Sequence, residues 1–272
     1  MIAKRLVAQV VPLLGVVVLT AGYASAAPDW AAASTAAVHP GVQTVTGNAQ
    51  CTSNFVFESG SKVYIGQAAH CATTGAVDKI NGCTSPSRPI GTKVRVTGAS
   101  KEGVLVYSSW LTMQAIRETD ANACAHNDLA LVELDPADVA KVNPSLPIWG
   151  GPTGLNTAGL RKNDEVVTYG SAQLGGEATD PNAKRGTSLG DSAGGWNHTI
   201  RTTTPGLPGD SGSAVLDAAG RAVGVLSTLN ISPDFGSNGV GDLAHELNYL
   251  HAHSALRDVH LVTGTQSFRP LR

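Results

Sequence analysis

The sequence predicts an all-β protein made of two packed β-barrels followed by a C-terminal helix. Charged residues make up only 15% of the chain, whereas Gly and Pro, which form turns, number 31 and 14. Short runs rich in Val, Leu and Thr fall into two clusters, separated by a connector rich in Pro, Asn and Gly at residues 135–159. Low charge, frequent turns and short strands are typical of an all-β extracellular fold. Two clusters with a joint between them indicate two barrels.

The expected strands are short and follow one another closely within each cluster. A helix is expected near the C-terminus, because Leu243, Leu247 and Leu250 follow helical spacing and Asp242 stands at the N-cap position. The expected strands cover residues 53–57, 62–65, 93–97, 104–110 and 129–134 in the first cluster, and 165–169, 213–216 and 221–227 in the second, where residues 217–220 form a hairpin loop.

The N-terminal residues predict a secretory signal peptide. Lys4 and Arg5 precede a mostly apolar run over residues 6–23, and small residues follow at 24–26. We expect cleavage after Ala26 and a secreted, extracellular protein. A membrane anchor is the alternative, since the run approaches spanning length, but the Gly, Pro and Gln within it favour the signal peptide.

The domain boundaries follow from these patterns. We expect a signal peptide at residues 1–26, a lead-in or pro-segment at 27–50, a first β-barrel at 51–148, and a second β-barrel with the terminal helix at 149–272. The net charge of −2 and the lack of a basic stripe exclude nucleic acid as a partner. We expect a monomer that has no membrane contact once the signal is removed.

The four cysteines, which all follow the expected cleavage site, predict two disulfides. An even number in an oxidising compartment favours disulfides, although four cysteines allow three pairings. Nearest-neighbour pairing joins Cys51 to Cys71 and Cys83 to Cys124. In the entropic model each closed loop stabilises the fold by about 3–4 kcal/mol. Zinc binding is the alternative, but no two cysteines have the C-x-x-C spacing.

Three short motifs carry the groups that amide hydrolysis needs. His70 lies in Gln-Ala-Ala-His-Cys, Asp128 directly precedes an apolar strand, and Ser211 lies in Pro-Gly-Asp-Ser-Gly-Ser. The reaction requires a nucleophile, a base and a group that orients the base, together with donors for the negative oxygen of the intermediate. The backbone N–H groups of Gly209 and Ser211 can supply these donors, because glycine brings no side chain into the turn.

In this order the three motifs resemble those of the trypsin/chymotrypsin family of serine peptidases, particularly its secreted bacterial branch. The resemblance spans roughly residues 50–250 and implies two packed antiparallel six-stranded Greek-key β-barrels. It also implies a Ser-His-Asp triad, in which Ser211 is the nucleophile, His70 the general base and acid, and Asp128 the orienting group. The backbones of Gly209 and Ser211 would form the oxyanion hole. Protein or peptide substrates are implied, with no cofactor and no metal.

Each motif has a competing interpretation, which for His70 is an ordinary surface histidine. The triplet Gly-Asp-Ser recurs at residues 190–192, but Ser192 is not followed by glycine or by a continuous strand, so Ser211 is favoured. Asp120 and Asp135 are alternatives to Asp128, which is favoured by the apolar strand after it. At the level of the whole protein, the alternatives are an esterase of the Gly-Asp-Ser type and a catalytically silent binding protein.

The sequence departs from the family at the residue before the nucleophile. In digestive members a newly formed N-terminus, Ile-Val-Gly-Gly, pairs with that aspartate, which is Asp210 here. No such start exists between Ala27 and Cys51. Activation by this route is therefore in doubt, and a local backbone amide or side chain is the alternative partner.

The resemblance also places the primary substrate pocket. Its base is Pro205, and its wall strand begins at Ser227 and includes Leu229, where the family has glycine. No carboxylate stands at the base, and Leu226 replaces the histidine of a subgroup that cleaves after acidic residues. We expect uncharged, small or medium apolar residues before the cut, with graded preference. Alternatively, Leu229 points into the core and the pocket is wide.

Overall fold

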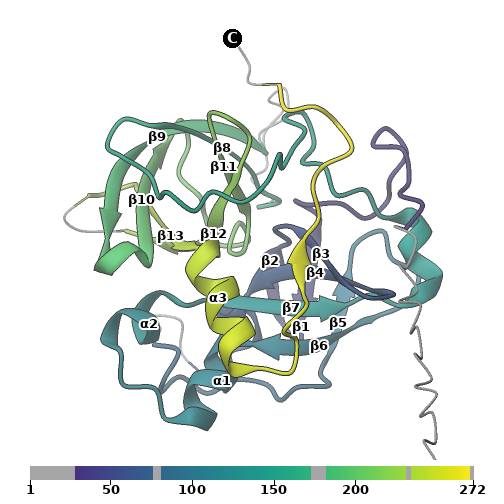
Figure 1. The fold of residues 1–272 in the computed structure, drawn as a ribbon, viewed down its shortest axis with the longest axis horizontal. Coiled ribbons are helices and arrows are strands. Elements are labelled where there is room, and N and C mark those ends of the chain that lie inside the picture. Colours follow the sequence, from purple (N-terminus) through teal and green to yellow (C-terminus); the bar gives the residue numbers. More distant parts are fainter. Residues whose placement is uncertain (1–27, 76–80, 173–181, 231–233, 270–272) are drawn as a thin grey trace, which may run out of the picture.

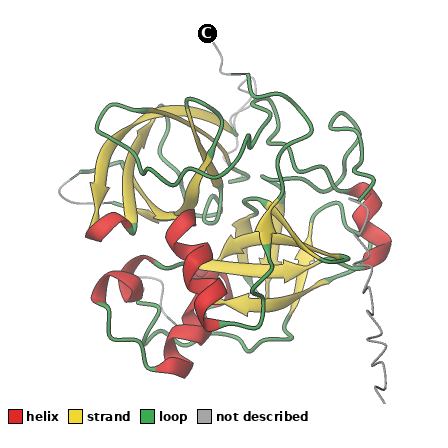
Figure 2. Ribbon diagram, in the orientation of Figure 1, coloured by secondary structure: helices red, strands yellow, loops and turns green. Residues whose placement is uncertain are grey.

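The strands lie in two groups, with the helices on the periphery of the molecule and between the groups (Figures 1 and 2). The structure is a computed structural model that describes residues 28–75, 81–172, 182–230 and 234–269. The expected signal peptide and its cleavage site lie outside the described residues. Two disulfides, Cys51–Cys71 and Cys83–Cys124, join the nearest neighbours in the sequence, as expected.

The first group is an eight-stranded antiparallel sheet in the order β14-β3-β4-β7-β6-β5-β1-β2. Its end strand β2 continues through residues 53–55 into β3, the strand next to the opposite end of the sheet. Its strands are β1 (Gln43–Thr46), β2 (Ala49–Thr52), β3 (Val56–Ser59), β4 (Lys62–Ala68), β5 (Lys93–Val96), β6 (Gly103–Ser108), β7 (Leu129–Glu133) and β14 (His260–Leu261).

The second group is a closed antiparallel barrel of six strands in the order β10-β13-β12-β11-β8-β9. Together the two groups match the expected chymotrypsin-like all-β fold, although the first sheet has eight strands instead of six. The strands of the barrel are β8 (Glu165–Tyr169), β9 (Ala183–Ser192), β10 (Asn197–Thr202), β11 (Ala214–Asp217), β12 (Ala222–Leu229) and β13 (Asn238–Asp242).

The domain boundaries differ from those expected. The predicted lead-in at residues 27–50 contains β1, which pairs with both β2 and β5 and is therefore part of the first sheet. Strand β14, predicted to belong to the second barrel, instead pairs with β3 of the first sheet. Residues near both ends of the described chain thus belong to the first sheet.

Helix α3 leads from the barrel to the last strand of the first sheet. Helix α3 follows β13 directly and runs toward α1 (Figure 1). Its leucines Leu243, Leu247 and Leu250 are buried, and the Asp242 side chain accepts a hydrogen bond from the His245 amide, which confirms the predicted helix and cap. The helices are α1 (Ser109–Ile116), α2 (Ala121–His126) and α3 (Leu243–His253), with short 3-10 turns η1 (Ala69–Ala72), η2 (Pro136–Lys141) and η3 (Ala193–Gly195).

Candidate active site

The sheet register brings His70 and Asp128 together. His70 lies in η1, directly after β4, and Asp128 directly precedes β7. Strands β4 and β7 are neighbours, with Ala68 opposite Leu129. The amide of Ala69 donates to the carbonyl of Asp128 at 2.6 Å, which extends the ladder to the two functional residues.

The Asp128 carboxylate holds His70 at two points. Its Oδ2 lies 2.6 Å from His70 Nδ1, and its Oδ1 accepts the His70 main-chain N–H at 2.8 Å. Both residues are buried. Burial lowers the pKa of His70, but the charge and the hydrogen bond of Asp128 outweigh it, so that the pKa is raised above its ordinary value.

A third group on Asp128 comes from the second barrel. The hydroxyl of Ser227, on β12, donates to Asp128 Oδ2 at 2.5 Å. From the sequence we expected Ser227 in the wall of the substrate pocket, and its contact with the carboxylate was missed. The sequence spacing of 99 residues gives no sign of this hydrogen bond, which depends on how the two groups of strands face one another.

The turn that carries Ser211 is attached to the first sheet. The Thr52 amide donates to the Ser211 carbonyl at 2.8 Å, and the Thr52 hydroxyl donates to the Gly209 carbonyl at 2.7 Å. Gly212 has φ +93°, and a Cβ there would lie 2.3 Å from the Thr52 carbonyl oxygen and 2.9 Å from the Ala68 amide. Only glycine permits this close approach, which places the serine turn beside the strand that leads to His70.

A disulfide lies beside the serine turn and His70. Cys51 precedes Thr52, and Cys71 follows His70, so that the Cys51–Cys71 bond ties the strand that holds the serine turn to the turn that holds the histidine. Among the described residues, the group that offers close metal-ligand atoms is Cys51, His70 and Cys71. Its two sulfurs are bonded to one another, so they are not available as thiolate ligands.

Asp210, the residue before Ser211, forms an ion pair with a buried lysine. Asp210 Oδ2 lies 2.5 Å from Nζ of Lys184, on β9, and both side chains are buried. Asp210 also accepts the amides of Leu207 at 3.1 Å and Ala172 at 2.9 Å. The sequence left open whether a local amide or side chain holds Asp210, and the structure contains both.

The space beside the serine turn, where the resemblance places the primary pocket, is crossed by a buried side chain. Asn238 accepts the Gly206 amide at 2.7 Å and donates to the carbonyls of Gly206 and Thr228, each at 3.0 Å. A Cβ on Gly206 would lie 2.8 Å from a methyl group of Leu226. Leu226 and Asn238 therefore fill the gap between the Gly206 segment and β12. Leu229 is 42% exposed and does not point into the core.

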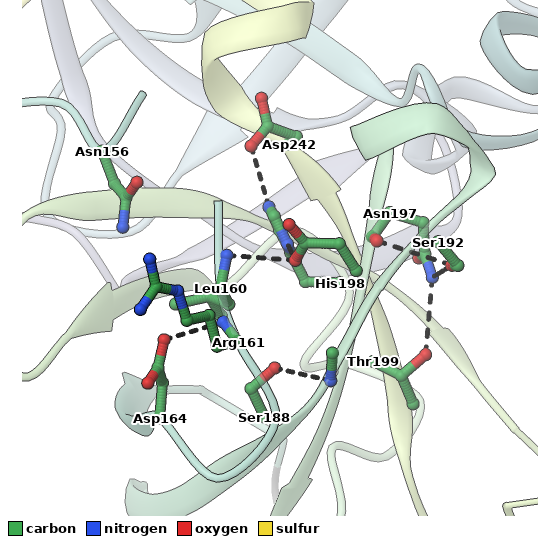
Figure 3. A network of polar contacts seen from close by, with 12 residues as sticks. Asn156, Leu160, Arg161, Asp164, Ser188, Ser192, Asn197, His198, Thr199 and Asp242 are labelled. Atoms are coloured by element: carbon green, nitrogen blue, oxygen red, sulfur yellow. Dashed lines mark hydrogen bonds and ion pairs between the residues drawn. The ribbon is translucent and has the colours of Figure 1, made fainter. Parts of the chain in front are cut away.

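The rival serine, Ser192, lies at the exposed end of β9, and its described side-chain partners are atoms of Asn197 (Figure 3). The preceding Asp191 binds the buried His198, whose Nδ1 lies 2.5 Å from Asp191 Oδ1 and whose Nε2 lies 2.8 Å from Asp242 Oδ2. Burial lowers the pKa of His198, but the hydrogen bonds and charges of the two carboxylates raise it overall. The second Gly-Asp-Ser triplet thus contributes a structural network inside the second barrel.

The two rival aspartates also have structural roles. The Asp120 side chain caps α2 by accepting the amides of Asn122 and Ala123. The Asp135 side chain caps η2 by accepting the amide of Ala137. Each carboxylate satisfies donors at a helix start, so neither takes the place of Asp128 beside His70.

Comparison with known proteins identifies the class. A family model of the trypsin-like peptidase domain matches residues 51–225. The chain therefore belongs to the trypsin-like peptidase family, and it is a serine-type endopeptidase that acts on proteins or peptides. No curated protein sequence matches it.

A solved structure shares the fold at low sequence identity. Protease A of Thermobifida fusca is 20% identical, with a TM-score of 0.53, and the match covers 84% of this chain and 100% of that one. The protease NAPase of Nocardiopsis is 18% identical, with a TM-score of 0.48, and the match covers 82% of this chain and 98% of that one.

In the described part of the chain, no helix is long and apolar enough to span a membrane.

Proposed function

We propose that the chain is a secreted endopeptidase that uses Ser211 as nucleophile, His70 as general base and acid, and Asp128 as the orienting carboxylate. The observation that carries the proposal is the buried 2.6 Å contact between His70 Nδ1 and Asp128 Oδ2, at the corner to which the Ser211 turn is bonded through Thr52.

The contact determines which imidazole nitrogen is free. Asp128 holds the proton on Nδ1, so that Nε2 carries a lone pair and takes the hydroxyl proton of Ser211 as Oγ attacks the peptide carbonyl carbon. The imidazolium then gives this proton to the leaving amine as the C–N bond breaks, which leaves an ester on Oγ. Water then attacks the ester carbonyl and gives a proton to Nε2, and the imidazolium returns this proton to Oγ as the ester C–O bond breaks, which releases the acid and the free serine hydroxyl. Asp128 remains ionised throughout and balances the imidazolium.

The negative oxygen of the tetrahedral intermediate needs donors. Neither the Gly209 nor the Ser211 amide donates to an acceptor within the residues that the structure describes. Gly209 has φ +104°, a conformation that favours glycine. We assign the two amides to the oxyanion hole. Removing one such donor typically lowers turnover by about 10²–10³.

The filled pocket supports a small-residue preference. Because Leu226 and Asn238 occupy the depth of the pocket, and the Lys184 ammonium that lies 3.3 Å from the Pro205 carbonyl oxygen is paired with Asp210, we propose cleavage after small, uncharged residues. The test is Leu226→Ala, which should raise the ratio of kcat/KM for Leu to that for Ala before the cut by about 10-fold or more. The conservative Leu226→Val is the matched control and should change the ratio less. An unchanged ratio in Leu226→Ala would remove Leu226 from the pocket.

The buried pair of Lys184 and Asp210 supports activity without N-terminal processing of the digestive type. The lysine places a positive charge where the resemblance expects a new amino terminus, so we propose that the folded chain is active whatever precedes residue 28. The two disulfides and the signal-like N-terminus support secretion, and we propose a monomer.

The proposed function is tested by incubating the secreted protein with a peptide library read by mass spectrometry, beside labelling with a fluorophosphonate. Cleavage and labelling that both disappear in Ser211→Ala are expected. Absence of labelling in the wild type would indicate a silent binding protein. Hydrolysis of short-chain esters without peptide cleavage would indicate an esterase.

A further inference from the structure

A buried acid on helix α3 contacts the main chain of the orienting aspartate. Glu246 Oε1 accepts the backbone N–H of Asp128 at 2.8 Å, although the two residues are 118 positions apart. The Glu246 residue is 0% exposed. The hydrolytic steps above use the Asp128 carboxylate and leave this backbone contact without a role.

The surroundings of Glu246 favour its neutral form. Its Oε2 has no hydrogen-bond partner among the described residues. The titratable groups that face it are Asp128, Asp242 and Tyr107, none of which is a cation. Burial raises the pKa of Glu246 well above its ordinary value, and the charges of Asp128 and Asp242 add to this, against the opposing effect of the Asp128 amide. A neutral acid still offers Oε1 as an acceptor.

The start of α3 is built to hold Glu246 in place. Asp242 caps the helix and is itself bonded to the buried His198 (Figure 3). A Cβ on Gly241 would lie 2.6 Å from Glu246 Oε1 and 2.8 Å from the His126 carbonyl oxygen. Gly241 therefore leaves the room that the acid needs to reach the Asp128 amide.

We propose that Glu246 is a positioning residue for the catalytic pair, which holds the main chain of Asp128 so that its carboxylate keeps both contacts with His70. The inference rests on the proposed function, in which Asp128 orients His70. The two carboxylate oxygens of Asp128 both bond to His70, one to its main-chain N–H and one to its ring, and Ser227 bonds to one of them as well. A shift of the Asp128 backbone would therefore turn the imidazole as well. A displacement of about 1 Å in such a site can lower turnover by about 10²-fold.

The experiment compares Glu246→Gln with Glu246→Leu. Gln keeps a neutral acceptor oxygen, so its kcat should stay within about 3-fold of the wild type, whereas Leu should lower kcat by about 10–100-fold with little change in KM. Activity is normalised to the sites that a fluorophosphonate titrates. The proton NMR signal of His70 Nδ1–H reports the contact directly and should move upfield in Glu246→Leu alone. Leu250→Val, in the same helix, controls for lost packing and should change neither readout.

Two results would overturn the proposal. One is an unchanged kcat and an unchanged His70 signal in Glu246→Leu. The other is an equal loss in Gln and Leu, which would show that an acceptor oxygen is not what matters. If Glu246→Leu does not fold, Glu246→Met, which is unbranched and also lacks the oxygen, replaces it. Failure of the proposed function can be told apart from failure of this inference. If the proposed function is wrong, the fluorophosphonate does not label the wild type. The NMR signal of His70 still shows in that case whether Glu246 holds the Asp128–His70 contact in place.

Discussion

Lys184 places its ammonium group 2.5 Å from the carboxylate of Asp210, inside the protein and next to the proposed nucleophile. Strand β9 thus supplies an ion-pair partner to the turn that presents Ser211. A buried charge without its partner is costly, so the pair fixes the turn whenever the barrel is folded. We therefore expect the conformation of the turn not to depend on a new amino terminus.

Lys184→Met is expected to lower the free energy of unfolding by about 3–5 kcal/mol, because it leaves the Asp210 carboxylate buried and unpaired. Chemical denaturation measures the loss, and peptidase activity should fall with it. The double variant Lys184→Met/Asp210→Asn is the control and should regain much of the stability, since both charges are gone. A single variant as stable and active as the wild type would contradict the role of the pair.

Ser211→Ala is expected to abolish peptidase activity, with a loss of about 10⁶ in turnover, and to leave the fold intact. Ser192→Ala is the matched control in the second Gly-Asp-Ser triplet. Its turnover should stay within a few-fold of the wild type, because the described hydrogen bonds of the Ser192 hydroxyl go to Asn197. Kinetics on a cleaved library peptide and circular dichroism check the two variants. Reversed phenotypes would move the active site to β9.

The pH profile should reflect the raised pKa of His70. The base form is lost as pH falls through this pKa, so activity should decline on the acid side with a midpoint at or above the ordinary value of 6.5. In Asp128→Asn the raising charge is removed, so the midpoint should move down while kcat falls by about 10⁴. Rates between pH 4 and pH 9 give the profile. A rate that stays flat to pH 4 would exclude histidine as the base.

The buried His198 should make stability depend on pH. Its pKa is raised in the fold, so its contribution is fully present below 6.5 and is lost as pH rises through the raised value. The pKa of Asp242 is lowered, so its own contribution is lost as pH falls below 3.8. His198→Gln should therefore cost most between these limits, about 3 kcal/mol at pH 5.5. Urea denaturation of both proteins across this range measures the difference, and a difference that grows above pH 7 would contradict it.

Most strands with apolar inward positions could be predicted from the sequence. Residues 165–169 were expected as a strand and form β8 with the same bounds. The sequence does not indicate strand β10, because two of its three buried residues, His198 and Thr202, are polar. The strand therefore lacks the alternation of apolar and polar residues that predicts a strand. Strand β13 was missed because two of its five residues are glycine. The strand expected at residues 104–110 ends at Ser108, where α1 begins and buries Trp110 and Met113 on one face.

The residues of the candidate active site also divide into those that the sequence indicates and those that it does not. His70, Asp128 and Ser211 lie in local motifs, so they could be proposed from the residues around them. Lys184, Ser227 and Glu246 act across barrels or strands, and their positions follow from register and packing that no short motif encodes. A buried Lys or Glu gives no sign in the sequence that distinguishes it from a solvated one.

The return of β14 to the first sheet has a consequence for biosynthesis. Leu261 lies opposite Phe57, and the Val262 amide bonds to the Val56 carbonyl, so this sheet joins residues some 200 positions apart. A nascent chain can close the second barrel first, but β3 keeps an open edge until residues 260–262 have been synthesised. Until then its free backbone groups are exposed to pairing with other chains. A chain interrupted after α3 is therefore expected to aggregate even though all three triad residues are already present.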